Sequence, residues 1–393
     1  MQKEFLTYLC QTSPEPLGLE IDHAQGIYLY TRDGRRYIDF ISGIGAANIG
    51  HGHPKVLAAI QTQMHKHLHV MVYGEYVQEA QVRYARRLTE LAPIKDGVVF
   101  FCNSGAEAIE GSLKTARKFT GRSKYVAFEG GYHGDTYGAL SAMSSAHYRR
   151  PFEPLLEVFE FLPFNNMSAL HRIDEQIAAV LFEPVQGEAG VRIPSPEFLP
   201  ALHQRCHETG ALMIADEVMT GFGRTGRLFA CEHWNVQPDI ICLAKALGGG
   251  LPLGAFIGRR DIMQTLSHDP PLAHVTTFGG HPLSCAAGLA ALEVLLEEKM
   301  VENGSRNGTR FLAELRQAFQ HHPHVKDIRG LGSFLAIEFD SEQATQRFVK
   351  NCRDAGLIIG WTLHRTNVVR AAPPLRMDSD EVENATRIIL HAA

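Results

Sequence analysis

Between residues 98 and 260 of the 393-residue chain, short apolar runs rich in valine and isoleucine alternate with longer amphipathic stretches. Runs that are apolar throughout, rather than at every second residue, are typical of strands buried on both faces of a parallel sheet. The stretches between them have helical spacing, as in residues 106–119. The alternation therefore predicts a three-layer α/β domain with a mostly parallel sheet. The expected strands are Val98–Phe101, Tyr125–Phe128, Ala178–Phe182, Leu212–Ala215 and Ile240–Leu243.

Polar residues follow these five runs, close to the point where each expected strand ends. In open α/β sheets, ligands bind at the carboxyl ends of the strands, so these residues are expected to lie along one edge and form one site. The simpler alternative, that polar residues merely begin loops, explains a single case more easily than five. The residues concerned are Asn103-Ser104-Gly105, the segment from Glu129 to Tyr132 and His133, Glu183, Asp216-Glu217 and Lys245.

The two ends of the chain have a different character. Residues 20–40 contain two strand-like segments around an Asp33-Gly34 turn signal. Residues 330–393 have the pattern strand, helix, strand, strand and a final helix capped by Asp378 or Ser379. We expect residues 1–50 to be the N-terminal segment of a small α+β lobe, residues 51–290 to be the large domain that carries the site, and residues 291–393 to be the C-terminal small domain.

The lysine and the aspartate at the predicted edge suggest a particular cofactor. Lysines are among the residues least often buried, and Lys245 directly follows an apolar strand. Taken alone, it is more simply a lysine that reaches the surface, but desolvation can also lower the pKa of a lysine and make its amine the nucleophile of a Schiff base. Asp216 ends the preceding strand and could keep the pyridine nitrogen of pyridoxal 5′-phosphate protonated, as that electron sink requires. Lys245 and Asp216 are therefore the candidate catalytic residues.

The segment after the first strand offers a phosphate site. A tight turn at Ser104, Gly105 and Ala106 leads into a helix, and backbone N–H groups at a helix N-terminus bind anions together with a hydroxyl group. Ser104 could equally be an ordinary N-cap with Glu107 completing a capping box. The two interpretations are compatible, because the same geometry serves both.

A dinucleotide site is the competing interpretation of the glycines in residues 221–226, which match the pattern G-x-G-x-x-G. That fingerprint requires a strand that runs directly into the glycines and a helix that begins there. Asp216 ends its strand well before Gly221, and the sequence after Gly221 is a poor helix start. The match is therefore interpreted as a loop coincidence.

With these residues in view, the sequence resembles the class III aminotransferases from about Gly26 to Leu375. Five motifs carry the resemblance and stand in the order found in the family: "NSGAEA", "EPVQGEAG", "ADEVMTGFGRTG", "CLAKALGGG" and "TTFGGHPLSCAAG". The resemblance implies the type I pyridoxal-phosphate fold and a homodimer with its active site at the subunit interface.

The resemblance also implies the roles of single residues around the cofactor. Lys245 would form the Schiff base and shuttle a proton, and Asp216 would pair with the pyridine nitrogen. Tyr132 would stack on one face of the ring and Val218 on the other, while His133 and Glu183 would complete the surroundings. Ser104, Gly105 and Ala106 would hold the phosphate, with Thr277 reaching it from the partner subunit.

Further matches concern the substrate. Arg370 corresponds to the arginine that binds the α-carboxylate of glutamate or 2-oxoglutarate, and Glu188 to the glutamate that covers this arginine while an ω-amino donor is bound; a structural ion pair is the alternative for Glu188. Thr276 is also expected beside the substrate.

Three residues depart from the family pattern. Met219 stands where a glutamine usually binds the cofactor's phenolic oxygen. Ile44 stands where ornithine aminotransferases carry tyrosine and acetylornithine enzymes carry isoleucine. Asp135 takes the place of an arginine that grips the donor's carboxylate, and either faces the donor or only structures its loop.

The resemblance therefore implies a ping-pong ω-aminotransferase. It would pass an amino group from an acetylornithine-, ornithine- or diamine-type donor, such as putrescine, to 2-oxoglutarate, giving glutamate and an aldehyde. The alternatives are a diaminopelargonate-type aminotransferase or an enzyme of the same fold with another outcome, such as an aminomutase, racemase or decarboxylase. A non-catalytic binding protein on this scaffold would be expected to have lost Lys245.

Composition excludes several other classes. A net charge of −5 gives no electrostatic reason to expect nucleic acid, and the apolar runs are too short to cross a membrane. Seven scattered cysteines and a first segment without a signal core predict a reducing cytoplasm. The histidines at 65–69 alternate around Lys66 with no acidic neighbour, and those at 321–324 include Pro323 in an expected loop, so no metal is expected.

Overall fold

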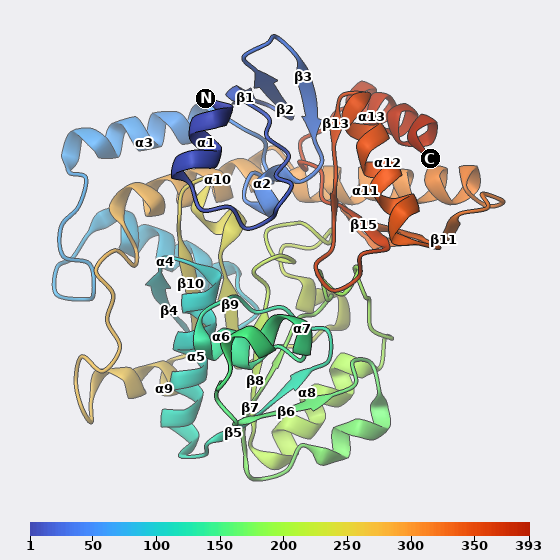
Figure 1. Ribbon diagram of the computed structural model, residues 1–393. Helices are drawn as coiled ribbons and strands as arrows, with labels where there is room; N and C mark the ends of the chain where they lie inside the picture. Colours follow the sequence, from blue (N-terminus) through green and yellow to red (C-terminus); the bar gives the residue numbers. More distant parts are fainter.

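The computed structural model describes all 393 residues, and its centre is a seven-stranded sheet with the strand order β4-β10-β9-β8-β7-β5-β6 (Figure 1). The strands from β5 to β9 pair in parallel, whereas β10 is antiparallel to both of its neighbours. The five predicted strands are present, and β6 and β10 join them. The strands are β4 Gly97–Cys102, β5 Lys124–Phe128, β6 Phe159–Leu162, β7 Ile177–Phe182, β8 Leu212–Asp216, β9 Ile240–Leu243 and β10 Gly254–Arg259.

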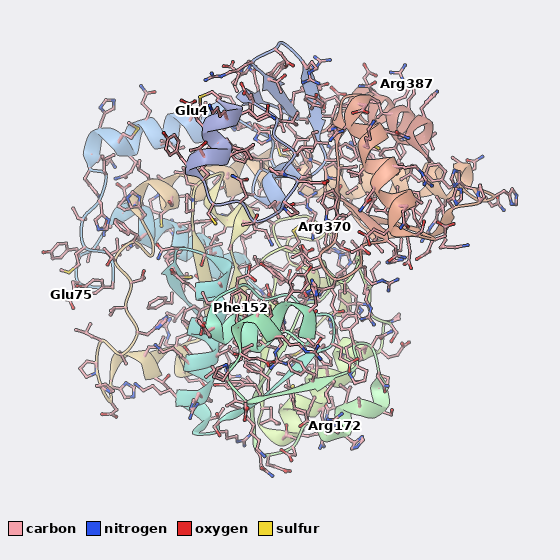
Figure 2. The ribbon with its side chains drawn as sticks, in the orientation of Figure 1. Glu4, Glu75, Phe152, Arg172, Arg370 and Arg387 are labelled. Atoms are coloured by element: carbon pink, nitrogen blue, oxygen red, sulfur yellow. The ribbon has the colours of Figure 1, made fainter.

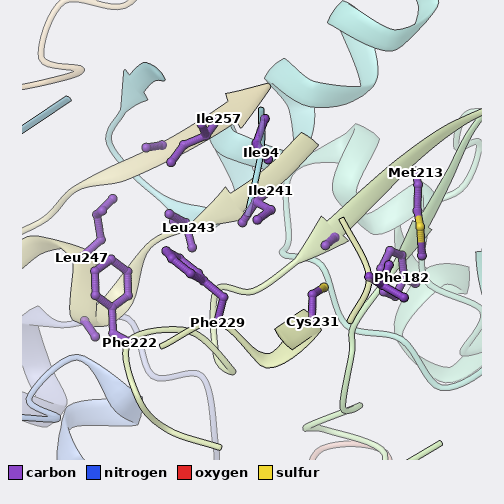
Figure 3. Close-up of a cluster of buried hydrophobic side chains, with 14 of the residues drawn as sticks. Ile94, Phe182, Met213, Phe222, Phe229, Cys231, Ile241, Leu243, Leu247 and Ile257 are labelled. Atoms are coloured by element: carbon purple, nitrogen blue, oxygen red, sulfur yellow. The ribbon is translucent and has the colours of Figure 1, made fainter. Parts of the chain in front are cut away.

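Helices cover both faces of this sheet, which confirms the three-layer α/β class. Successive residues of a strand point to opposite faces, so Met213 of β8 packs into the apolar cluster on the side of α8. Its neighbour Ile214 packs on the other face with Ile109 of α5. Figure 3 shows Met213 in the first cluster, near Phe182 of β7. Burial on both faces is the reason why the strands are apolar at every position.

The chain's ends pack together beside the large sheet (Figure 1). Ile27, between β1 and β2, and Phe40, directly after β3, share an apolar cluster with Phe311 and Ile389 from the C-terminal helices. One sheet has the order β1-β2-β3-β13 and the other β11-β12-β15-β14. The strands are β1 Ile21–Gln25, β2 Tyr28–Thr31, β3 Arg36–Asp39, β11 Val325–Leu331, β12 Phe334–Phe339, β13 Leu357–Ile358, β14 Gly360–Trp361 and β15 Val368–Ala371.

The last helix begins at Ser379 with Asp378 as its N-cap, one of the two predicted caps. The domain boundaries at residues 50 and 290 remain a prediction. The α-helices are α1 Gln2–Tyr8, α2 Ser42–Gly45, α3 Pro54–Lys66, α4 Glu79–Leu91, α5 Gly105–Thr120, α6 Tyr137–Ser141, α7 Ala146–Arg149, α8 Phe198–Thr209, α9 Arg260–Met263, α10 Pro282–Glu297, α11 Met300–Ala318, α12 Glu342–Asp354 and α13 Ser379–Ala392. Short 3-10 helices occur at Arg150–Phe152, Met167–Arg172, Ala230–Trp234, Lys245–Gly248 and Gln264–Ser267. None of the helices has the length and apolar character needed to cross a membrane.

Candidate active site

A cavity of about 470 Å³ lies where the five predicted strands end, and a polar residue that follows each of them lines it. The prediction that these residues gather in one place is thus confirmed. Arg370 of β15 adds a cation from the C-terminal segment, and Figure 2 places it at the junction between that segment and the centre of the molecule. The five residues from the strand ends are Ser104, Tyr132, Glu183, Asp216 and Lys245.

One end of the cavity suits an anion. Ser104 is the N-cap of α5, and its hydroxyl accepts from the N–H of Glu107 at 3.2 Å. Glu107 does not complete the expected capping box, because its carboxylate accepts from the N–H of Asn103 instead. The first turn of a helix leaves its N–H groups without intrahelical partners, so the amides of Gly105 and Ala106, two residues that line the cavity, are available as anion donors.

The anion end is also closely fitted. A Cβ atom at Gly105 would lie 3.0 Å from Val218, and one at Gly134 would lie 2.6 Å from Ala106. Gly134, whose φ of +117° also disfavours a side chain, has no room for a Cβ atom, and at Gly105 a Cβ atom would have to displace Val218 slightly.

Asp216 is a buried carboxylate on the cavity wall. One of its oxygens is 2.8 Å from Nδ1 of His133, and the other accepts from the N–H of Val218 at 3.1 Å. These contacts fix the carboxylate and leave it able to accept from a cationic N–H group of a ligand. Its neighbour Glu217 points away from the cavity and accepts from the N–H groups of Ala230 and Cys231, so it is not part of the site.

Lys245 lies in the same cavity with a left-handed backbone at φ 49°. Such a conformation is costly for a residue with a Cβ atom and is concentrated at functional sites. Burial lowers the pKa of Lys245, and Arg370 lowers it further, whereas Asp216 and Glu188 act in the opposite direction. The net lowering favours the neutral amine, which is the nucleophilic form.

Glu183 and Asp135 hold the segment that carries Tyr132. Glu183 accepts from the N–H of Tyr132 at 2.9 Å and from the N–H of Gly187 at 2.9 Å. Burial and nearby Asp216 raise the pKa of Glu183, while His133 and the two N–H groups oppose the shift. Asp135 lines the cavity and accepts from the hydroxyl of Tyr132 at 2.8 Å.

Arg370 and Glu188 form an ion pair inside the cavity, with side chains only 12% and 13% exposed. Burial alone would raise the pKa of Glu188, but Arg370 and the N–H of Leu363 hold it below its ordinary value. The carboxylate therefore stays ionised and covers the guanidinium.

Three predicted site residues lie outside the lining of this cavity. Ile44 is 57% exposed and has a positive φ of 60°. Thr277 is exposed, and Thr276 lines a second cavity of about 290 Å³ beside Tyr73 and Phe101. Thr276 still contacts the first cavity's lining, because the side-chain amide of Asn103 donates to its hydroxyl at 2.9 Å.

Sequence reasoning missed several lining residues that have no catalytic side chain. Ala46, Leu251, Pro252 and Leu253 also line the cavity. The glycine-rich segment directly after Lys245 was the available signal for the last three. Met219 lines the cavity next to Gly45, and its thioether has no proton to donate.

The glycines of residues 221–226 form turns and no helix begins there, so the dinucleotide interpretation is wrong. Arg224 in this loop is buried and donates to the carbonyl oxygens of Ser333 and Pro373. No three histidine, cysteine, aspartate or glutamate side chains lie close enough together to hold a metal ion.

Comparisons with known proteins identify the family of the chain. The family model described as aminotransferase class-III matches residues 10–393. Acetylornithine aminotransferase of Methanopyrus kandleri is 43% identical over 363 residues, which cover 92% of this chain and 90% of that protein.

Solved structures share the fold along the whole chain. Ornithine aminotransferase of Toxoplasma gondii, crystallised with partial occupancy of pyridoxal phosphate, has a TM-score of 0.92 and 33% identity, covering 99% of this chain and 93% of that one. An aminotransferase of Bacillus anthracis has a TM-score of 0.94 and 28% identity, covering 100% of this chain and 97% of that one. The chain belongs to the class-III aminotransferases, enzymes that work with pyridoxal phosphate.

Proposed function

We propose that the protein is an ω-aminotransferase that passes an amino group from an acetylornithine-, ornithine- or diamine-type donor to 2-oxoglutarate, giving glutamate and an aldehyde. The observation that carries the proposal is the Arg370–Glu188 pair in the same cavity as Lys245. A free Arg370 suits a dicarboxylate, and an Arg370 neutralised by Glu188 suits a donor without a carboxylate at that position. The names of the relatives, acetylornithine and ornithine aminotransferases, support the same donor class.

The residues of the cavity fit pyridoxal phosphate. Ser104, Gly105 and Ala106 offer amide donors for a phosphate, Asp216 offers a carboxylate for a pyridinium N–H, and Lys245 offers an amine. The cofactor, when bound, supplies the electron sink for cleavage of the C–H bond at the carbon that carries the transferred amino group.

Around the cofactor, this chain's own groups bind, orient and move protons. Lys245 would hold the cofactor and then use Nζ as the base and acid that moves a proton. Asp216, oriented by His133, would keep the pyridine nitrogen protonated. Tyr132 and Val218 would enclose the ring, and Glu183 would hold the backbone of Tyr132 in place.

An enzyme of this fold with another outcome, such as an aminomutase, racemase or decarboxylase, remains the alternative. The paired Arg370 and Glu188 disfavour it, because an enzyme with a single substrate has less need of an arginine that can be covered. A panel of amino donors with 2-oxoglutarate, followed by glutamate formation, separates these possibilities. An enzyme that converts one substrate without forming glutamate would contradict the proposal.

The Glu188→Ala protein should prefer glutamate over the ω-amino donor more strongly than the wild type does. Removing Glu188 leaves Arg370 permanently uncovered, and the loss of one charge-assisted contact is worth about 1.5–3 kcal/mol, or about tenfold to a hundredfold in relative specificity. The second-order rate constants of the two half-reactions measure this. Glu188→Gln keeps an acceptor without the charge, so its preference for glutamate should lie between those of the wild type and Glu188→Ala. An unchanged preference would make Glu188 a structural ion pair.

The second substrate-related prediction concerns Asp135, whose carboxylate lines the cavity. It should attract a donor with a distal ammonium and repel one with a distal carboxylate, so putrescine, cadaverine or ornithine should be better donors than 4-aminobutyrate. Asp135→Arg should move the preference toward 4-aminobutyrate by about twofold to fivefold. The factor is modest because the side chain is exposed to solvent, which screens its charge.

A matched variant separates charge from positioning at this residue. Asp135 also holds the hydroxyl of Tyr132, and Asp135→Asn keeps that acceptor while it removes the charge. It should shift kcat/KM for putrescine relative to 4-aminobutyrate in the same direction as Asp135→Arg. A wild-type preference for 4-aminobutyrate, or no shift in either variant, contradicts the role of Asp135 in donor choice.

We also propose that two copies of the chain form the active enzyme, with Thr277 completing the partner's phosphate site. Thr277 lies in a surface region with exposed apolar side chains, and monomeric proteins rarely expose many together. Ile44, exposed beside the cavity, would become covered in the same assembly. Light scattering on the cofactor-loaded protein tests the arrangement, and a stable monomer that holds its cofactor tightly would contradict it. The exposed apolar residues of this region are Tyr73, Tyr76, Val77, Val82, Val275 and Phe278.

A further inference from the structure

Glu188 is held by more than its arginine. The loop of residues 362–367, which connects β14 to β15 and leads to Arg370, also contacts it. The N–H of Leu363 donates to the second carboxylate oxygen of Glu188 at 2.9 Å, while Arg370 donates to the first. The N–H of His364 donates to the carbonyl oxygen of Glu188 at 3.1 Å. Both oxygens of the carboxylate are thus bound to the same hairpin, one through a side chain and one through the backbone.

The loop itself is fixed from the opposite side by two side-chain contacts. The hydroxyl of Tyr148 donates to the carbonyl oxygen of Leu363 at 2.8 Å. Nδ1 of His364 lies 3.0 Å from the carbonyl oxygen of Gly130, in the segment that leads to Tyr132. Since a carbonyl oxygen only accepts, Nδ1 carries the proton and donates. Burial lowers the pKa of His364, which favours this neutral form.

The rings of Tyr148 and His364 also pack together, with their centroids 5.5 Å apart. The two contacts therefore hold the peptide that donates to Glu188 at a set position relative to the cavity wall.

This arrangement has a consequence for the movement of Glu188. To uncover Arg370, the carboxylate must leave both donors, so the N–H of Leu363 loses its partner together with the guanidinium. A loop that is held firmly keeps that N–H aimed at Glu188 and stabilises the covered state. A loop that is held loosely can turn the N–H toward water, and the covered state loses part of its advantage.

We propose that the loop of residues 362–367 is a latch on Glu188, and that Tyr148 and His364 are positioning residues that set how readily Arg370 is uncovered. They thereby set the balance between dicarboxylate substrates and ω-amino donors. The inference rests on the proposed function of Glu188 and Arg370. It adds Tyr148 and His364 to the residues that control specificity.

The test uses the holoenzyme and glutarate, an unreactive dicarboxylate, whose binding is followed through the cofactor's absorbance. Tyr148→Phe keeps the ring and removes only the donor to Leu363, so it should tighten glutarate binding about twofold to tenfold, the range for one neutral hydrogen bond. The rate constant of the half-reaction with glutamate should rise relative to that with ornithine by a similar factor.

Two controls distinguish a latch from a general disturbance. In a Glu188→Ala background, Tyr148→Phe should leave the affinity for glutarate unchanged, because there is no carboxylate to hold. His364→Leu should act like Tyr148→Phe, and His364→Asn, which restores a donor near the position of Nδ1, should recover wild-type affinity.

The outcomes separate the latch from the proposed function. If Glu188→Ala tightens glutarate binding but Tyr148→Phe and His364→Leu do not, the latch is wrong and the switch of Glu188 stands. Equal effects of Tyr148→Phe with and without Glu188 would also overturn the latch. If Glu188→Ala itself changes neither glutarate binding nor donor preference, the switch fails and the latch fails with it.

Discussion

The Lys245→Ala protein should fold, lose the visible absorbance of lysine-bound cofactor and turn over at least about 10²–10⁴-fold more slowly than the wild type. That range is the usual contribution of a positioned acid–base group, and Lys245 would in addition provide the covalent attachment. Folding should survive, because the amine is buried with its pKa lowered and forms no hydrogen bond that the fold requires. Absorbance, circular dichroism and glutamate formation over many turnovers measure the three properties.

A small primary amine provides the matched control for this variant. Removing the lysine side chain leaves space in the cavity where Nζ stood, so methylamine added to Lys245→Ala should restore part of the proton transfer. Rescue that depends on the concentration and basicity of the amine would show that the lost group is an amine. Multiple turnovers near the wild-type rate without added amine would remove Lys245 from the mechanism.

Much of the seven-stranded sheet could be predicted, because the burial that selects its apolar residues acts on each strand separately. Strands such as β8 are buried on both faces, which requires apolar residues at every position and makes them visible in the sequence. The site followed from topology, since the carboxyl ends of parallel strands meet at one edge. Asp216 ends β8 and Lys245 lies two residues beyond the end of the adjacent β9, so both line one cavity. β10 was missed because its Gly254 and Gly258 weaken the strand pattern.

Contacts between distant segments had no comparable signal. The N–H of Leu363 that holds Glu188, and the hydroxyl of Tyr148 that holds Leu363, join residues from three separate parts of the chain. Backbone donors carry no residue-type signature, so a pattern search cannot find Leu363. Thr277 illustrates the other limit, because a residue predicted to act across a subunit interface does not join the cavity of a single chain.

Asp216 and Glu217 are adjacent acidic residues with opposite surroundings, and the same substitution should affect them differently. Asp216→Asn should lower kcat by about tenfold to a thousandfold, because an opposite charge typically raises the pKa of a cationic group by about 1–3 units and the pyridine nitrogen would lose that support. Its stability should change little, since the amide oxygen can still accept from the N–H of Val218 and the amide NH₂ can donate to Nδ1 of His133 in the tautomer protonated on Nε2. The absorbance of the bound cofactor should report the lost proton, so the spectrum and kcat should change together.

The Glu217→Gln protein is the matched control, because it makes the same chemical change one residue further along the chain. Glu217 accepts from Ala230, Cys231 and Thr220, and an amide NH₂ placed among these donors would leave a buried group unpaired. We expect the free energy of unfolding to fall by about 1–3 kcal/mol, while kcat of the folded enzyme stays within a few-fold of the wild type. Thermal unfolding and steady-state kinetics on both proteins decide the assignment. If Asp216→Asn kept a near-normal kcat, or Glu217→Gln lost kcat without losing stability, the roles of the two carboxylates would be reversed.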